Sequence, residues 1–336
     1  MKKMINNASD FVDETIEGII AAYGDYLKLN NGDKREIITN YPVKEKKVGI
    51  VTAGGSGHLP VFLGYVGQGM LDGCAVGNVF ASPSASKMVD VIKACDNGSG
   101  VLCLYGNYGG DSMNFEMARD TVEFDDNIKT LSIRVKDDIA SATKDSAEKR
   151  RGVAGMVYAF KIAGAAADMG LSLEEVAEVT QKALDNIRSI GLALSPCIVP
   201  EAGEPTFSIR EDEVEIGMGI HGEPGIETSV LMRADELTDK LISQLEEDMH
   251  LRAGDEVSVM INGLGATPKE ELLIVYRRVH QILSEQEITV YMPHIGEFAT
   301  SMEMAGCSVT LFKLNEQMKE LLRYPAKTPF YTNANI

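Results

Sequence analysis

The sequence predicts an α/β protein with two domains. Short apolar runs typical of buried strands alternate with stretches of helical period, most clearly over residues 47–170. Several of the runs end in glycine-rich loops, and ligands of α/β folds bind at such strand ends. The 336 residues are enough for two domains with a large buried core. We place the domains at residues 1–185 and 186–336.

The first domain begins with a helix over residues 8–24, where apolar positions form one stripe and Ser9 or Asp10 can cap the start. Residues 25–46 are polar, so we predict a loop there. Further elements are predicted in this order: strand Lys47–Thr52, helix Ser86–Ala94, strand Gly100–Tyr105, helix Met113–Arg119, strand Ile128–Val135, and helices Val153–Met169 and Leu173–Ile190.

The second domain begins near Ala193–Pro200. Its predicted elements are strand Val214–Ile216, helix Asp235–Leu245, strand Glu256–Asn262, helix Lys269–Ser284, and strands Thr289–Met292 and Ser308–Phe312. The tail, Tyr324–Ile336, is predicted to be irregular.

Composition and charge exclude several classes of function. The net charge of −18 repels phosphate backbones, so we expect no direct contact with nucleic acid. The five cysteines are scattered without a CxxC pair, which predicts buried free thiols and no metal site. No apolar run is long enough for a membrane helix, and Met1–Asn7 lacks the apolar core of a signal peptide. We therefore expect a cytoplasmic protein that does not contact a membrane.

One glycine-rich stretch, Glu215–Gly225, surrounds a single histidine, His221. An imidazole can act as a nucleophile or base near neutral pH. The glycines around it let the backbone turn sharply and let a ligand approach closely; they are Gly217, Gly219, Gly222 and Gly225. The stretch therefore predicts a small ligand on His221.

Two other interpretations of this stretch stay open. The spacing Gly217-x-Gly219-x-x-Gly222 formally matches a dinucleotide fingerprint, although Glu223-Pro224 interrupts a βα turn and no ribose-binding acid follows. The stretch could also be a plain turn with an incidental histidine.

A second glycine-rich loop, Ala53–Pro60, follows the strand at Lys47–Thr52. Its candidate site residues are Gly54, Gly55, Ser56, Gly57 and His58. Backbone N–H groups at such a strand end can hold a ligand. No Lys-Ser/Thr pair follows Gly57, so this is not a Walker A loop and we expect no bound nucleotide cofactor. His58 is interpreted either as a general base or as a structural histidine.

A third loop, Gly106-Asn-Tyr-Gly-Gly-Asp111, follows the strand at Gly100–Tyr105. The Asp111 carboxylate is well placed to accept hydrogen bonds from a polyol. The alternative is that Asp111 caps the next helix.

Together these loops resemble the substrate-binding K subunit of dihydroxyacetone kinase. The resemblance is carried by Gly54-Gly-Ser-Gly-His58, Asn107-Tyr-Gly-Gly-Asp111 and Gly217–Gly225. Supporting stretches are Gly64–Met70, Arg150–Ala154, Asn262–Pro268 and Thr300–Gly306. Each motif alone is weak, but their joint order and spacing are specific. The family implies two α/β domains, each built on a mixed β-sheet flanked by helices, and usually a homodimer.

The resemblance also implies roles for the candidate residues. His221 would attach dihydroxyacetone covalently as a hemiaminal, which explains selectivity against glycerol, since glycerol has no carbonyl. His58 and Asp111 would be the acid/base pair, and Gly54–Gly57 would contact the ligand. The phosphate donor of the kinase sits on a separate ADP-binding subunit.

The sequence departs from the kinase pattern at two charged positions. Leu59 stands where kinase subunits usually carry a glutamate, and Gly106 stands where they commonly carry a lysine that contacts the substrate. A site without that lysine should stabilise a transferring phosphoryl group less well, whereas attachment to His221 needs neither group.

This pattern resembles the operon coactivator branch of the family, DhaQ, a non-catalytic paralogue that binds dihydroxyacetone and then a TetR-like transcription activator. We therefore expect a ligand-sensing coactivator. The alternative is the substrate-binding subunit of a phosphotransferase-dependent dihydroxyacetone kinase.

Overall fold

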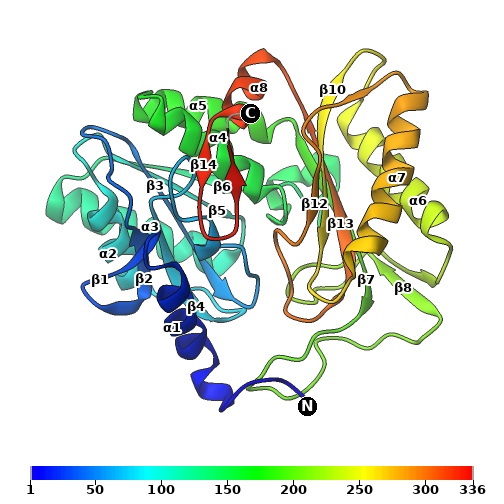
Figure 1. Cartoon of the computed structure of the whole chain (residues 1–336), viewed down its shortest axis with the longest axis horizontal. Helices are drawn as coiled ribbons and strands as arrows, with labels where there is room; N and C mark the ends of the chain where they lie inside the picture. Colours follow the sequence, from blue (N-terminus) through cyan, green and yellow to red (C-terminus); the bar gives the residue numbers. More distant parts are fainter. Residues whose placement is uncertain (1, 335–336) are drawn as a thin grey trace. The chain divides into compact units, whose positions relative to one another are not determined.

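The computed structural model describes residues 2–334, which divide into two compact units (Figure 1). Unit 1 contains the chain up to Val135, Met156–Ala183 and the segment from Met318 onward. Unit 2 contains Lys136–Gly155 and Leu184–Gln317. The chain therefore passes between the units more than once, which differs from the two continuous domains expected from the sequence.

Unit 1 is built on a six-stranded sheet with strand order β1-β2-β4-β3-β5-β6. The strands are β1 (Leu27–Asn30), β2 (Asp33–Thr39), β3 (Gly49–Ser56), β4 (Gly73–Val79), β5 (Val101–Gly106) and β6 (Thr130–Val135). β1 and β2 form an antiparallel hairpin, and β2 is antiparallel to β4, whereas β4, β3, β5 and β6 are mutually parallel. The sheet is therefore mixed.

Helices cover both faces of the unit 1 sheet. They are α1 (Phe11–Tyr23), α2 (Ala85–Cys95), α3 (Gly109–Asp126), α4 (Met156–Asp168), α5 (Leu173–Leu184) and α8 (Glu316–Arg323). One core cluster joins α2 and α3 to the sheet, with Val91, Ile92, Phe115, Val51 and Tyr105 among its members. The helix α4 is buried almost along its whole length.

Unit 2 is built on a seven-stranded sheet with order β11-β10-β13-β7-β8-β9, in which β12 also pairs with β10. The strands are β7 (Ile187–Ser195), β8 (Glu213–Ile216), β9 (Glu227–Val230), β10 (Glu256–Gly263), β11 (Thr289–Val290), β12 (His294–Gly296) and β13 (Ala305–Lys313). Only the pairs of β10 with β11 and with β12 are parallel, so this sheet is also mixed.

Two helices, α6 (Ala234–Met249) and α7 (Lys269–Glu285), pack on each other and on the unit 2 sheet, on the same side in Figure 1. Their apolar faces form the core with strand residues such as Val257, Val259, Ile261 and Val309. The expected class, two α/β domains on mixed sheets flanked by helices, is the fold that the structure has.

Several parts of the predicted secondary structure are wrong. Residues 25–46 contain the β1–β2 hairpin, which the sequence hides because its strands carry many polar residues, one of which, Glu36, is buried. The predicted helix Leu173–Ile190 ends at Leu184, and β7 begins at Ile187 because it pairs with β13 and β8. The segment predicted to be loop from Ala53 continues β3 to Ser56, since Gly54 pairs with Val76 of β4.

The segment Lys136–Gly155 belongs to unit 2 because of the buried carboxylate of Asp137. This carboxylate accepts hydrogen bonds from the backbone of Val153 (2.9 Å) and Gly155 (2.8 Å) and from the Ser189 hydroxyl (2.5 Å) of β7. The backbone of the segment also pairs with Ser189. These contacts attach Lys136–Gly155, which precedes α4 in the sequence, to β7, a strand inside the unit 2 sheet.

The C-terminal segment returns to unit 1. It contains most of α8 and the short hairpin of β14 (Ala326–Lys327) and β15 (Thr332–Asn333). This hairpin lies in the tail Tyr324–Ile336, which is predicted to be irregular. Lys161 of α4 donates a hydrogen bond to the carbonyl of Leu321 at 2.6 Å, and the Thr328 hydroxyl donates to the carbonyl of Gly64 at 2.9 Å. Residues 335–336 lie outside the described part. Within residues 2–334, no helix is long and apolar enough to span a bilayer.

Candidate functional site

The carboxyl ends of β3 and β5 form the candidate ligand edge of unit 1. The two strands are parallel neighbours. The chain leaves β3 toward β4 on one side, then crosses to β5 on the other side. In open α/β sheets, ligands bind at such a reversal of strand order, outside the carboxyl ends of the strands.

The glycine-rich end of β3 is packed tightly against neighbouring loops. A Cβ atom on Gly54 would lie 1.9 Å from the ring of Phe62, and one on Gly55 would lie 2.7 Å from the backbone nitrogen of Ala81. The Ser56 hydroxyl donates to the carbonyl of Gly77 at 2.8 Å. Gly54 and Gly55 are therefore required for close packing of the loops, and Ser56 joins β3 to β4. Gly57 follows the end of β3, with a φ of +101°.

His58 is fully buried two residues beyond β3. Its ring stacks on Phe80, with centroids 4.8 Å apart, and meets the edge of Phe62. Phe80 belongs to the loop that follows β4. The imidazole is thus held in a fixed orientation by two aromatic rings.

Asp111 is the third residue of α3 and is buried. The N-cap position belongs to Tyr108, so Asp111 does not cap the helix. A carboxylate in the first helical turn is stabilised by the helix dipole. A Cβ on the neighbouring Gly110 would lie 2.7 Å from the Ser82 hydroxyl, so the loops after β4 and β5 also touch. His58 and Asp111 therefore stand at one sheet edge, on loops that meet the same β4 loop.

His221 lies on the hairpin loop between β8 and β9 of unit 2. The loop is closed at its base by a hydrogen bond from the backbone of Ile226 to Ile216 at 2.8 Å. The His221 side chain is 25% exposed, and its Nδ1 lies 3.0 Å from Oε1 of Glu223. The backbone N–H of His221 donates to Oε2 of the same carboxylate at 2.9 Å. One carboxylate therefore contacts both the ring and the backbone of this histidine.

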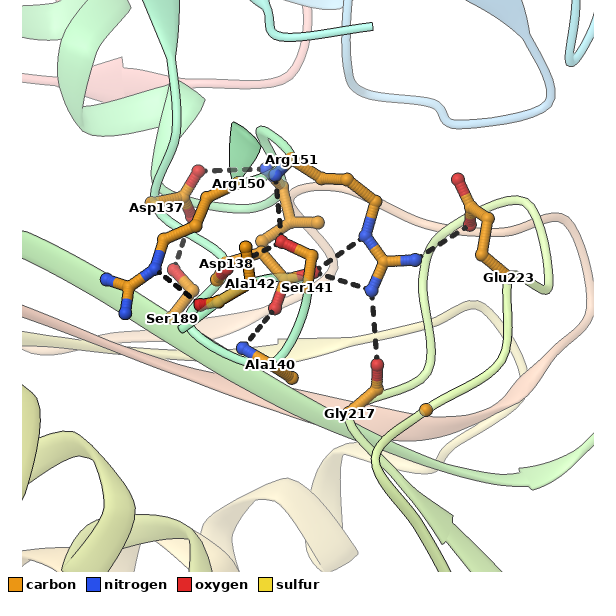
Figure 2. Close-up of polar contacts among 12 residues, drawn as sticks. Asp137, Asp138, Ala140, Ser141, Ala142, Arg150, Arg151, Ser189, Gly217 and Glu223 are labelled. Atoms are coloured by element: carbon orange, nitrogen blue, oxygen red, sulfur yellow. Dashed lines mark hydrogen bonds and ion pairs between the residues drawn. The ribbon is translucent and has the colours of Figure 1, made fainter. Parts of the chain in front are cut away.

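Glu223 in turn faces Arg151, which Figure 2 shows between Glu223 and Asp138. Burial opposes ionisation of Glu223, but the hydrogen bond and charge of His221 and the charge of Arg151 outweigh burial and lower the Glu223 pKa to about 2. Burial raises the pKa of Asp138 to about 6, although the charge of Arg151 acts against this shift. Around neutral pH both acids are therefore carboxylates.

The geometry of this loop does not favour the dinucleotide interpretation. A strand, β9, follows the loop, whereas the fingerprint requires a helix whose N-terminus receives the pyrophosphate. A Cβ on Gly219 would lie 2.1 Å from Oε2 of Glu223 and 2.4 Å from Nη1 of Arg151. The glycine makes room for a protein carboxylate and a guanidinium rather than for a phosphate.

The predicted site residues are therefore divided between the units. Gly54, Gly55, Ser56, Gly57, His58 and Asp111 belong to unit 1, and His221 belongs to unit 2. The sequence analysis gave no role to Glu223, Arg151 or Asp138. Glu223 and Arg151 lie in stretches that carried the resemblance, but only the folded chain shows that their side chains meet.

The two departures from the kinase pattern have different surroundings. Gly106 ends β5, and a Cβ there would lie 3.0 Å from the ring of Tyr108 and 3.1 Å from the sulfur of Met156. The space for a longer side chain at residue 106 is thus narrowed by Tyr108 and Met156. Leu59 directly follows His58 and is partly exposed.

Metal-ligating side chains do not cluster in the described part of the chain, where no group of three or more His, Cys, Asp or Glu could hold an ion. The five cysteines are buried free thiols.

Comparison with known proteins identifies the family. The Dak1 domain matches residues 17–330. The chain belongs to the Dak1 family. A Dak1 relative from Listeria innocua, "PTS-dependent dihydroxyacetone kinase 2, dihydroxyacetone-binding subunit DhaK", is 44% identical over 331 residues, which cover 98% of this chain and 99% of the relative.

Two further similar proteins carry other names. The "L-erythrulose kinase" of Pectobacterium atrosepticum is 42% identical and is matched by the whole of this chain over 57% of its own length. The solved structure of the "Dihydroxyacetone kinase operon co-activator Dha-DhaQ" has a TM-score of 0.89 and 28% identity, covering 98% of this chain and 99% of the coactivator. The resemblance to the dihydroxyacetone kinase K-subunit family is therefore confirmed.

Proposed function

We propose that this Dak1 protein is a dihydroxyacetone-binding subunit that attaches its ligand covalently to His221. The observation that carries the proposal is the environment of His221: its imidazole is partly exposed on a glycine-rich loop, and its Nδ1 contacts the Glu223 carboxylate. A small ketone can reach such a ring. The similarity to a subunit whose name states that it binds dihydroxyacetone supports the choice of ligand.

The chemistry is addition of a ring nitrogen to the ketone carbon. The nitrogen lone pair forms the new bond, the carbon–oxygen π bond breaks toward oxygen, and the oxygen takes up a proton to give a hemiaminal. Only carbonyl compounds can react in this way, so glycerol is excluded by chemistry rather than by size. The ligand hydroxyls would be bound by His58 and Asp111, which also move protons during addition.

Of the two roles proposed for the chain, that of a kinase subunit has the stronger support. Identity to the Listeria kinase subunit is 44% over nearly all of both chains, compared with 28% for the coactivator structure. His58 and Asp111, the acid/base pair of the kinase, are both present and buried. In this role the dihydroxyacetone held by the chain would receive a phosphoryl group from a separate ADP-binding subunit.

The second candidate is the coactivator of a TetR-like transcription activator, which the sequence pattern favoured. The specific observation for it is Gly106, where the lysine of kinase subunits is missing and Tyr108 and Met156 narrow the space for it. In this role the liganded chain would bind the activator, and ligand attachment would shift a conformational equilibrium. A homodimer is proposed for both roles.

The test is intact-mass spectrometry with dihydroxyacetone, followed by a coupled assay with an ADP-loaded kinase subunit and its phosphoryl donor. A ligand-sized mass increase with turnover supports the kinase subunit. A mass increase without turnover, together with ligand-dependent binding of a TetR-like regulator, supports the coactivator. Absence of any mass increase at millimolar dihydroxyacetone contradicts covalent capture.

The double change Leu59→Glu and Gly106→Lys separates the two roles further. If the wild type already turns over, restoring both charges should change the rate little. If the wild type is inactive and the double variant gains turnover, the coactivator is favoured. Gly106→Lys alone is the matched control for the displacement of Tyr108 and Met156.

A further inference from the structure

We infer that Glu223 is a positioning residue that sets the tautomer and orientation of His221, and that Arg151, anchored on Asp138, holds Glu223 in place. The chain of contacts runs from Asp138 through Arg151 and Glu223 to Nδ1 of His221. The chemical purpose of this arrangement rests on the proposed function, but the arrangement itself can be tested without a ligand.

The tautomer follows from the chemistry of the contact. An ionised carboxylate only accepts hydrogen bonds, so in a neutral imidazole the proton must be on Nδ1, which lies 3.0 Å from Oε1 of Glu223. The in-plane lone pair is then on Nε2. The second carboxylate oxygen binds the backbone N–H of His221 at 2.9 Å, which also fixes the ring relative to its own backbone.

Arg151 prevents this carboxylate from turning away. Its Nε and Nη2 reach Oδ2 of Asp138 at 2.9 and 2.8 Å, and its Nη2 also donates to the carbonyl of Gly217 at 3.2 Å. Nη1 is then directed at Oε2 of Glu223, at 3.7 Å. Figure 2 shows the guanidinium joining these groups.

The anchor itself is rigid. Asp138 is buried, and its other carboxylate oxygen accepts from the backbone of Ala140 at 3.0 Å. The backbone N–H of Arg151 donates to the Ser141 hydroxyl at 2.9 Å. The segment Lys136–Gly155 therefore presents a fixed guanidinium to the start of the histidine loop and to Glu223.

The addition step benefits from this arrangement. When Nε2 bonds to the ketone carbon, the π electron pair moves to oxygen, which takes up a proton that comes ultimately from solvent. The ring then carries one positive charge shared between its nitrogens, while Nδ1–H stays on Glu223. The carboxylate stabilises a charge that the free ring does not have, which favours the adduct.

The experiment is ¹⁵N NMR of histidine-labelled protein without ligand, with His221 assigned by loss of its signals in His221→Asn. The variants are Glu223→Gln, Glu223→Ala and Arg151→Met. Glu227→Gln is the control, because Glu227 is an exposed acid on the neighbouring strand that pairs with Lys240 instead. Adduct formation with dihydroxyacetone is measured for each variant by intact mass.

We expect the Nδ1–H tautomer in the wild type and in Glu227→Gln, and a mixture of tautomers in Glu223→Ala. Glu223→Gln keeps an acceptor oxygen but loses the charge, so it should keep the tautomer and weaken the adduct by at least about tenfold. Arg151→Met should also weaken the adduct. A merely structural role for Glu223 would move the unfolding temperature but not the tautomer.

An Nε2–H tautomer in the wild type overturns the inference, and so does an unchanged tautomer in folded Glu223→Ala. If Glu223→Ala does not fold, the inference is still tested by the tautomer of the wild type and by the strength of the adduct in Glu223→Gln. If the tautomer depends on Glu223 but no adduct forms with any protein, the proposed function fails and the positioning role stands.

Discussion

Gly219 shows how one missing side chain allows the histidine loop to form its contacts. The Glu223 carboxylate and the Arg151 guanidinium occupy the volume that a Cβ at this position would need. Contacts of 2.1 and 2.4 Å are far inside van der Waals distance, so these groups would have to move. The glycine is therefore needed for close approach of two charged groups, which sequence spacing alone did not reveal.

Gly219→Ala should displace Glu223 from His221 and weaken dihydroxyacetone attachment by about tenfold or more, because the hydrogen bond to a charged group is lost. Intact-mass titration measures the effect. Gly18→Ala is the control, since Gly18 lies in α1 with nothing within 4 Å of its Cβ position. This control should be neutral or stabilise the fold by about 0.5–1 kcal/mol. An unchanged titration for Gly219→Ala contradicts the prediction.

His221→Ala should abolish the adduct while changing the free energy of unfolding by less than about 1 kcal/mol, as expected for a partly exposed loop residue outside the core. Mass spectrometry and denaturant unfolding measure the two effects. A ligand-sized mass increase that persists in His221→Ala would show that another nucleophile carries the ligand.

At the scale of elements, each unit contains a segment that is distant in sequence from the element it packs on. Lys136–Gly155 is held on β7 by the buried Asp137 carboxylate, and it carries Arg151 to the histidine loop. The C-terminal segment is held on α4 by Lys161, whose Nζ also lies 5.7 Å from the centre of the Tyr324 ring. Both attachments depend on buried polar groups, whose hydrogen bonds are costly to lose.

Lys161 should make stability depend on pH. Burial lowers its pKa from the ordinary 10.5 to about 7, although the charge of Asp168 acts against the shift. Between these values the unfolded chain binds more protons than the folded one, so Lys161 adds stability as pH rises from 7 toward 10.5. The expected slope is up to about 1.4 kcal/mol per pH unit.

Urea unfolding at pH 7.5 and 9.5 measures this slope. The same measurement on Lys161→Met separates the contribution of Lys161 from that of other titrating groups. The difference in slope between wild type and variant should correspond to uptake of up to one proton. Equal slopes for the two proteins would show that Lys161 is protonated to the same extent in the folded and unfolded chains.

At the scale of the whole molecule, the dominant property is the net charge of −18. It repels the phosphates of nucleic acid at long range, and this repulsion is strongest at low ionic strength. Either proposed role lets the chain act without touching DNA, because the kinase partner and the transcription activator are both proteins.

The isolated chain should therefore not shift the mobility of duplex DNA, even at about 50 mM salt, where binding by a basic protein would be strong. Dihydroxyacetone should not change this result. A shift that weakens steeply with added salt would reveal a basic surface that the net charge hides.

Much of the fold class could be predicted from the sequence because core strands and amphipathic helices have local periodic signals. The runs that became β3, β5, β6, β10 and β13 are apolar enough to be predicted without neighbours. The β1–β2 hairpin was missed because its strands carry many polar residues, including the buried Glu36. The strand β7 was missed because it continues an apolar pattern that also suits a helix.

The sequence by itself determined the family and the candidate residues His58, Asp111 and His221, because glycine-rich motifs keep their order and spacing along the chain. Only the tertiary structure decided which segments belong to which unit, and which groups surround His221. Arg151 and Glu223 are 72 residues apart, and Asp138 lies before them both. Their meeting depends on long-range packing around the Asp137 carboxylate and on the absence of a side chain at Gly219, and neither leaves a local pattern in the sequence.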